Sequence, residues 1–432
     1  MTELPHLLLV VGIGGPSPKL LAPALAGSAR ITWLFDRRDL TKPERDTAVM
    51  GGVGRPVPVG SEEELLAAAL AVHAKDPADG LLTFSESSLR ITARIGQRLG
   101  LPFNSPAAAE RLTNKYLQRQ ALSAAGVPCP RFHPVREEGE LATAAAAVDF
   151  PAVLKPVRGG GSALTTAVDS PEELRAAWAV AAELLAALNA EDRTHRLLAD
   201  VDRPHMVLEE RLRGKSWHGD ERYGDYVSVE SVIQGGEVRH LTVTDKLPLA
   251  AGFRENGQLH PSVLPADRLA ELTAMTEAAL AALEVTEGIT HTELKLTADG
   301  PRVIEVNGRA AGGLWVTLQH AAGYDLIGQA ARAALRLGEV GLPEFTGHAA
   351  MFSPCLAPEL ADRPVRVRLA ESFEQRPGVH SVHGLHEGSF DLSLGGGHAL
   401  LAYVSGPGAE AVHEHWAALR AAMSVTPYQA AP

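Results

Sequence analysis

The sequence has 432 residues, and 40 basic against 52 acidic side chains give it a formal net charge of -12. That length predicts about three domains of roughly 150 residues each. Hydrophobic and charged contents of 45% and 21% exclude wholesale disorder. The acidic balance argues against broad binding to nucleic acid or to anionic membranes.

The cysteine content and the first residues indicate in which cellular compartment the protein is expected. Two cysteines, Cys129 and Cys355, cannot form a disulfide framework and favour a reducing environment. No apolar stretch approaches the roughly 20 residues of a membrane helix. The first six residues lack the basic start of a signal peptide. We therefore expect a cytoplasmic protein that contacts neither membranes nor nucleic acid.

Short apolar runs and helical patterns alternate along the first hundred residues. The apolar runs predict strands over 7–11, 31–35 and 80–84, and the periodic segments predict helices over 17–26, 61–74 and up to residue 99. Such alternation is typical of βαβ units on a parallel sheet.

The chain becomes rich in strands after residue 205. Before that point we expect a helix over 105–125, with Pro106 just inside its start and Gly126 just past its end. A strand over 151–156 and a helix over 172–188 follow. The later elements are strands over 206–212, 226–233, 237–244, 290–297 and 301–306, and a helix over 267–283. The tail after about residue 340 again reads as strands and turns.

Two glycine patterns could contact phosphate. Gly12-x-Gly14-Gly15 lacks the third glycine of a dinucleotide fingerprint, so structural turn glycines are the favoured interpretation. The second pattern, Gly159-Gly160-Gly161-Ser162, begins four residues after Lys155. Glycine amides can approach phosphate oxygens, and a lysine adds positive charge. A flexible hairpin tip explains this second pattern equally well.

A β-hairpin is predicted from residue 290 to residue 307. A three-residue loop centred on Asp299 would place Thr297 opposite Pro301 and, further along, Glu293 opposite Glu305. Directly opposed side chains lie about 5 Å apart at Cβ, so two carboxylates there would repel each other without a cation. The adjoining apolar side chains should face the core: Leu294, Leu296, Ile304 and Val306.

The same hairpin offers an oxygen donor set. Asn307 follows Glu305 by two residues and should share its face. Oxygen donors without Cys or His favour Mg²⁺, or alternatively Mn²⁺, shared with substrate phosphates. Arg309 would then face a reacting phosphate. The competing interpretation is a pair of exposed carboxylates on a solvated strand.

Two further segments are ambiguous from sequence. The strand over 206–212, which includes Glu209, Glu210 and Leu212, could clamp an adenine through its backbone or could be an ordinary strand. Lys115 is expected in the middle of a helix, where a lone lysine is usually solvated.

Taken in order, these segments resemble the ATP-grasp superfamily over roughly residues 80 to 340. The motifs are Asn114-Lys115-Tyr116, Val153-Leu154-Lys155-Pro156 with the glycine loop, Leu208-Glu209-Glu210, His291-Thr292-Glu293 and Ile304-Glu305-Val306-Asn307-Gly308-Arg309. Three further segments resemble the L-amino-acid ligases that make dipeptides, and related carboxylate–amine ligases: Gly224-Asp225-Tyr226-Val227-Ser228-Val229-Glu230, Thr244-Asp245-Lys246 and Gly252-Phe253-Arg254-Glu255. Several spaced motifs in one order are more specific than any one of them.

The resemblance implies an α/β fold with ATP-grasp architecture. An N-terminal βαβ domain would cover residues 1–103. Residues 104–204 would form a helix that packs on the first domain and a small lid that carries the glycine loop. A larger strand-rich domain with the metal site would cover residues 205–432 and include an appendage from about 340.

The resemblance also implies a role for each candidate residue. ATP phosphates would be bound by Lys115, Lys155, Gly160, Gly161 and Ser162, adenine by Glu209, Glu210 and Leu212, and Mg²⁺ by Glu293, Glu305 and Asn307. Arg309 would be catalytic, and Glu255, Gly313 and, more weakly, Glu86 would contact the substrates. Asp225 is a loosely held candidate for the ribose. Gly313 would leave room for a bulky amino acid.

The activity implied is formation of an amide through an acyl phosphate, with release of ADP and phosphate. The substrates would be amino acids or another carboxylate and amine, and a homodimer is common among enzymes of this kind. An ATP-grasp carboxylase or purine-pathway ligase is the alternative, although the Gly-Phe-x-Glu segment argues against it. A third hypothesis is a regulatory nucleotide-binding module without catalysis.

Overall fold

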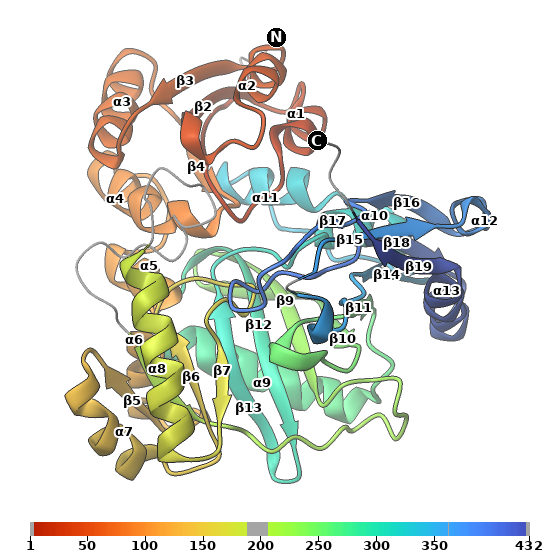
Figure 1. Ribbon diagram of the computed structural model, residues 1–432. Coiled ribbons are helices and arrows are strands. Elements are labelled where there is room, and N and C mark those ends of the chain that lie inside the picture. Colours follow the sequence, from red (N-terminus) through yellow and green to blue (C-terminus); the bar gives the residue numbers. More distant parts are fainter. Residues whose placement is uncertain (1–3, 188–205, 362, 429–432) are drawn as a thin grey trace.

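The computed structural model describes residues 4–187, 206–361 and 363–428. Figure 1 shows an N-terminal α/β unit above two strand-rich units, with the C-terminal strands and helices to one side. In the described chain the strands form four sheets. None of the described helices combines the length and the apolar character needed to cross a bilayer. Residues 1–3 lie outside the described residues, as does residue 188, where the helix predicted over 172–188 ends.

The first unit contains a parallel sheet with the strand order β3-β2-β1-β4, as the alternating pattern predicts. Its strands are β1 (His6–Val11), β2 (Arg30–Asp36), β3 (Arg55–Val59) and β4 (Gly80–Thr83), and its helices are α1 (Pro18–Leu25), α2 (Pro43–Gly51), α3 (Glu62–Lys75) and α4 (Leu89–Leu99). Every side chain of β1 is buried, because helices cover both faces of the sheet. Leu8 and Val10 pack with α3 and α4, while Leu7 and Leu9 share a core with the later helix α11 (Leu326–Ala334).

The predicted helix over 105–125 is two helices, α5 (Pro106–Thr113) and α6 (Lys115–Ala124). Asn114 interrupts them with extended backbone angles and caps α6, since its Oδ1 accepts a hydrogen bond from the Leu117 amide at 3.2 Å. The Lys115 amide donates to the Val157 carbonyl at 2.8 Å. The prediction of a mid-helix Lys115 is therefore wrong, because this residue begins a helix and is held against the lid.

The lid is an antiparallel sheet with the order β5-β8-β6-β7. Its elements are β5 (Phe132–Val135), α7 (Leu141–Val148), β6 (Ala152–Pro156), β7 (Thr166–Val168), α8 (Pro171–Ala186) and β8 (Met206–Glu210). Leu154 and Leu208 pack against the helices, including Trp178 of α8. Because β8 completes this sheet, the lid extends past the boundary predicted at residue 204, which itself lies outside the described residues.

The largest sheet follows the order β13-β12-β9-β10-β11-β14-β18-β16, and we call it the central sheet. Its strands are β9 (Tyr226–Gln234), β10 (Glu237–Lys246), β11 (Gly257–His260), β12 (Glu287–Thr297), β13 (Gly300–Asn307), β14 (His348–Phe352), β16 (Val379–His383) and β18 (Leu401–Gly406). One face of its first strands packs on α9 (Ala266–Ala282) through residues such as Val229 and Leu294. The opposite face of these strands carries buried polar side chains such as Glu230 and His291, while Val232 and Ile289 on that face pack on α11.

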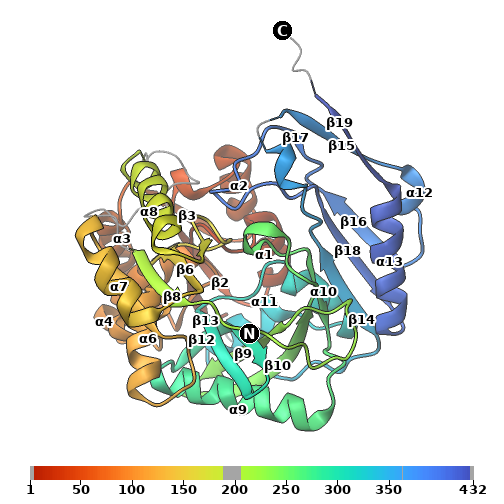
Figure 2. The ribbon, with the colours of Figure 1, turned by 60° about the horizontal axis from the view of Figure 1, so that its bottom comes forward.

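The tail after residue 340 continues the central sheet. β14 pairs with β11, and β18 and β16 extend the sheet, so these strands are part of the same structure rather than an appendage. The remaining elements are α10 (Leu314–Ala322), α12 (Glu371–Glu374) and α13 (Ala409–Ala422), and a small sheet of β15 (Val365–Leu369), β17 (Glu387–Gly388) and β19 (Met423–Pro427). Figure 2 shows α13 lying along β18 and β14.

Candidate active site

The β12–β13 hairpin pairs Glu293 with Glu305, as predicted, but by a different register. The turn is one residue tighter, so that Thr297 faces Gly300 rather than Pro301. A β-bulge at Ile304 then shifts the register and restores the pairing of the two glutamates. The bulge also moves Ile304 out of the predicted core position and into the lining of a cavity, while Val303 takes the core position.

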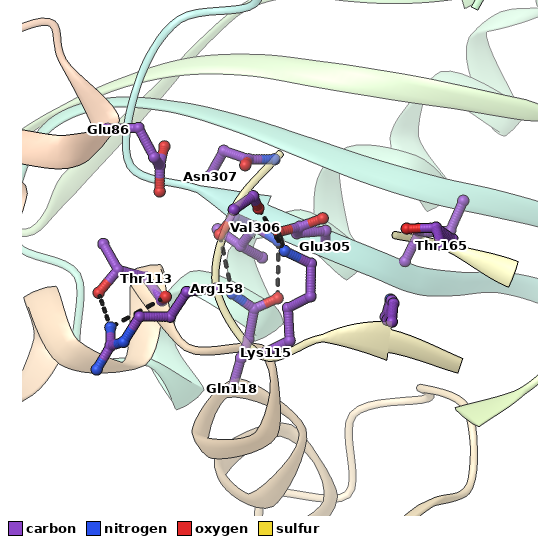
Figure 3. Close-up of polar contacts among 12 residues, drawn as sticks. Glu86, Thr113, Lys115, Gln118, Arg158, Thr165, Glu305, Val306 and Asn307 are labelled. Carbon is purple, nitrogen blue, oxygen red and sulfur yellow. Dashed lines mark hydrogen bonds and ion pairs between the residues drawn. The ribbon is translucent and has the colours of Figure 1, made fainter. Parts of the chain in front are cut away.

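Side chains of α6 hold the bulged edge strand in place. Gln118 bonds both backbone groups of Val306, donating from Nε2 to the carbonyl at 2.9 Å and accepting from the amide at 2.8 Å (Figure 3). Arg119 donates to the Ile304 carbonyl. The bulge therefore has specific partners, and it fixes the direction in which Glu305 and Asn307 point.

His291 lies between two carboxylates. Its Nδ1 is 2.8 Å from Glu230 and its Nε2 is 3.1 Å from Glu293. Burial alone would lower the pKa of His291, but the charge and hydrogen bonds of these carboxylates raise it to about 9. His291 is therefore protonated at neutral pH, and its charge helps to lower the pKa of Glu293 against the effect of burial.

Lys115 connects the lid to the hairpin. Its Nζ lies 2.9 Å from Glu305 and donates to the Gly159 carbonyl at 2.6 Å. Figure 3 shows Lys115 and Glu305 pointing toward one another from the helix and the strand, with Asn307 and Glu86 beside them. Asn307 donates from Nδ2 to the His291 carbonyl at 3.5 Å, so its Oδ1 remains available to a cation.

Lys155 and Arg119 share Glu209. The Lys155 Nζ and the Arg119 Nε lie 2.8 and 3.1 Å from its two carboxylate oxygens. Burial alone would raise the pKa of Glu209, yet the two cations lower it. Burial lowers the pKa of Lys155, and the carboxylate opposes that effect. Lys155 thus points into the cavity as a buried cation whose present partner could be exchanged for phosphate.

The glycine loop is anchored at its far end. Gly159 and Gly161 have positive φ angles of 101° and 65°. The Ser162 hydroxyl donates to the Phe253 carbonyl at 2.9 Å, and the Leu164 amide donates to the Ser393 carbonyl at 2.5 Å. The loop therefore borders the cavity between the lid and residues of the C-terminal half.

Arg309 follows the hairpin and lies close to both the first domain and the glycine loop. Its Nε lies 3.3 Å from Glu86, which the first domain places just after β4. A side chain at Gly160 would come within 3.9 Å of its guanidinium. Burial raises the pKa of Glu86, and Arg309 opposes that shift. Glu86 therefore positions Arg309 in the structure and does not itself line the cavity.

The predicted substrate residue Glu255 already has a cationic partner. Lys246, which is nearly fully buried, places Nζ 3.0 and 3.2 Å from the two carboxylate oxygens, and Gln258 accepts from the same nitrogen at 3.2 Å. Tyr226 donates its hydroxyl to Glu255 at 3.4 Å. A substrate ammonium at Glu255 would share the carboxylate with Lys246.

A cavity of about 520 Å³ joins these residues. Its lining includes nearly all the predicted site residues: Lys115, Lys155, Gly160, Gly161, Ser162, Glu209, Glu210, Leu212, Glu255, Glu293, Glu305, Asn307 and Arg309. Glu210 lies nearer the surface, with its carboxylate shared by Arg131 and Arg302. Asp225 pairs with Lys295 at 2.6 Å and is outside the lining, so the structure gives no support to its ribose role.

The cavity-forming region matches the family description "ATP-grasp domain" over residues 148–318. The crystal structure of an L-amino acid ligase from Bacillus licheniformis superposes on 99% of this chain and 100% of its own, with a TM-score of 0.78 and 20% identity. The chain has the ATP-grasp fold. That confirms the predicted architecture.

Two curated relatives align with this ATP-grasp chain. Alanine–anticapsin ligase from Bacillus subtilis (strain 168) is 28% identical over 254 residues, which are 58% of this chain and 52% of the relative. Carnosine synthase 1 from Homo sapiens is 26% identical over 335 residues, 71% of this chain and 36% of the relative. The alignments thus span about half or less of the relatives' own lengths.

Gly313 differs from its predicted role in this ATP-grasp protein. An added Cβ would lie 2.6 Å from the Met351 sulfur and 2.8 Å from the Tyr403 ring, so Gly313 does not border open space. The neighbouring Gly312 lines the cavity, and nothing lies within 4 Å of a Cβ added there. The glycine that leaves room in the cavity is Gly312.

These two glycines give a matched test of stability. We expect Gly313→Ala to lower the free energy of unfolding by about 2 kcal/mol, because its φ of 74° disfavours a side chain and the space is filled. Gly312→Ala should change it by less than about 0.5 kcal/mol. Urea unfolding of both variants measures the difference, and equal effects would contradict this assignment.

A second stability prediction concerns Arg119. Arg119→Met removes a fully buried guanidinium and leaves Glu209 with Lys155 alone, so we expect a loss of about 3 kcal/mol in the free energy of unfolding. Arg131→Met is the control, since its contact with Glu210 at 3.5 Å is largely exposed and should cost less than about 0.5 kcal/mol. Similar midpoints for both variants would refute the structural role of Arg119.

The donor set suits a hard divalent cation. Two carboxylates and an amide oxygen converge from paired strands, with no sulfur among them. Lys115 and His291 presently balance the two carboxylates, which would otherwise repel each other. The residues thus fit Mg²⁺ as the predicted occupant.

Sequence reasoning missed the roles of several residues of the candidate site. His291 could have been recognised, because it precedes Glu293 by two positions on the same strand face. Glu230 and Lys246 lie in segments that resemble the dipeptide ligases, but no role was predicted for either residue. Arg119 carried no signal, since helix packing brings it to the site.

Proposed function

We propose that this protein is an ATP- and Mg²⁺-dependent ligase that joins an amino acid carboxylate to an amine or a second amino acid. The single observation that carries the proposal is the convergence of two lysines, a glycine loop, opposed glutamates and Arg309 on one cavity. The similarity to alanine–anticapsin ligase and to carnosine synthase 1 supports amino acids as substrates. The resemblance of the 252–255 segment to dipeptide ligases supports the same choice.

In this proposal the lid side of the cavity binds ATP. Lys115 and Lys155 would exchange their carboxylate partners for phosphate oxygens, and the glycine loop would bring its amides to the same phosphates. The segment after β8, including Leu212, would contact the adenine. Glu210, with its partly buried ion pair to Arg302, would border that site.

Residues on the hairpin side of the cavity would neutralise the negative charge of the phosphates during phosphoryl transfer. Glu293, Glu305 and Asn307 would hold Mg²⁺, which would supply charge neutralisation for the phosphates. A substrate carboxylate oxygen would attack the γ-phosphorus, forming an acyl phosphate as the bond to ADP breaks. Arg309 would stabilise oxygen charge during this step and during attack of the amine on the acyl carbon.

An assay of phosphate release tests the proposal directly. ADP formation that requires ATP, Mg²⁺ and a pair of amino acids, with a product mass equal to their sum less one water, is the expected result. Dependence on bicarbonate would favour the carboxylase alternative instead. Absence of phosphate release with every pair would favour a binding module.

A further inference from the structure

The end of the cavity near Glu255 is built largely by the C-terminal part of the chain. Met351, Ser353, His398 and Leu401 line it, and all four lie beyond the residues that the family description matches. Ser353 donates its hydroxyl to the Glu255 carbonyl at 2.9 Å, which ties this wall to the predicted substrate residue. Among these four side chains, His398 is the one that can transfer a proton.

The backbone around His398 is fixed on both sides. Cys355 and His398 form an antiparallel bridge. The Leu356 amide donates to the Gly397 carbonyl and the Ala399 amide to the Pro354 carbonyl, both at 2.7 Å. The ring is therefore presented to the cavity from a supported segment.

The contacts of the ring determine which nitrogen is basic. Nδ1 lies 3.2 Å from the Ser353 carbonyl and 3.6 Å from the Cys355 sulfur. A carbonyl oxygen only accepts, so Nδ1 carries the proton of the neutral ring and Nε2 has the lone pair. Within the described chain, both hydrogen-bond contacts of this ring use Nδ1.

The other potential bases in the cavity lining are already ion-paired. Glu209, Glu210, Glu255, Glu293 and Glu305 each have a cationic partner within 4 Å. His291 lies between Glu230 and Glu293, with its two ring nitrogens 2.8 and 3.1 Å from their carboxylate oxygens. Among the described carboxylates and imidazoles of the lining, His398 alone has no charged partner.

We propose that His398 is the general base for the amine substrate. The inference rests on the proposed ligase function, in which the amine arrives mainly as an ammonium ion. His398 Nε2 would take one proton from that ion. The freed nitrogen pair would attack the acyl phosphate carbon, the carbon–nitrogen bond would form, and phosphate would leave with the electrons of the broken carbon–oxygen bond. The nitrogen would lose its second proton to the departing phosphate as the neutral amide forms.

Hydroxylamine separates the two halves of the reaction. It is unprotonated at neutral pH and captures acyl phosphates as hydroxamates without a base. In His398→Asn, the side-chain amide can still donate toward the Ser353 carbonyl but cannot act as a base. We expect this variant to form hydroxamate within about threefold of wild type and to lose amide formation with an amino acid amine by about 100-fold.

Controls make each outcome decisive. His386→Asn, in the same C-terminal part but outside the cavity lining, should retain both activities. Thermal unfolding checks that the His398 variant is folded, and His398→Gln provides a second variant. Loss of both activities in a folded variant, or retention of both, would overturn the role of His398. If wild type forms neither hydroxamate nor amide with any amino acid, the proposed function fails and the inference fails with it.

Discussion

Arg309→Met is expected to reduce turnover at least 100-fold while ATP still binds. The guanidinium lies between Glu86 and the glycine loop, where it can meet oxygen charge that develops only during the reaction. Loss of one such donor typically costs 10²- to 10³-fold in kcat, or about 3 to 4 kcal/mol. Turnover at saturating substrates and the ATP-dependent shift in unfolding temperature measure the two effects separately.

Two companion variants sharpen this prediction. Glu86→Gln keeps the guanidinium but removes its ion-pair partner, so we expect a smaller loss of about 10-fold. Arg309→Lys keeps the positive charge without the planar donor geometry, so its loss of turnover should lie between those of Glu86→Gln and Arg309→Met. If Arg309→Met turned over within threefold of wild type, the catalytic assignment would be incorrect.

Glu305→Gln is expected to produce the other large loss, again about 100-fold in turnover, together with a higher Mg²⁺ requirement. The substitution removes one of two opposed carboxylates and half of the charge that would hold the cation. It also leaves Lys115 without its partner at 2.9 Å. The Mg²⁺ dependence of turnover, and of stabilisation by ATP, provides the measurement.

Glu284→Gln is the control for this loss. Its carboxylate lies outside the cavity lining and is largely exposed beside Arg111 at 2.6 Å, so its turnover and Mg²⁺ midpoint should stay within about threefold of wild type. Chelation by EDTA should stop turnover in wild type and in this control alike. An unchanged Mg²⁺ midpoint in Glu305→Gln would argue that the cation lies elsewhere.

The hairpin shows what sequence could and could not predict. Patterning predicted both strands and the opposition of Glu293 to Glu305. The tighter turn and the bulge at Ile304 each shift the register by one residue, and the two shifts cancel at the glutamates. Neither is visible in local periodicity, because the bulge is stabilised by Arg119 from a helix far away in the sequence.

The segment 105–125 and the residues around the cavity were likewise predicted only in part. A proline start and a glycine end correctly bounded that segment, but the break at Asn114 depends on a tertiary contact of the Lys115 amide with Val157. The ordered motifs located nearly all the candidate residues that line the cavity. The segments that contain Glu230 and Lys246 were recognised, but their contacts with His291 and Glu255 were not predicted, because strand pairing rather than sequence spacing brings these residues together.

The pairing of β14 with β11 has a consequence for engineering. Because this contact joins the matched domain to the C-terminal strands, a fragment ending near residue 318 would expose the backbone edge of β11 and invite aggregation. Chimeras between relatives should therefore be joined outside the central sheet. Exchanging acceptor preference would require transplanting residues 348–406 along with the catalytic core, since both shape one wall.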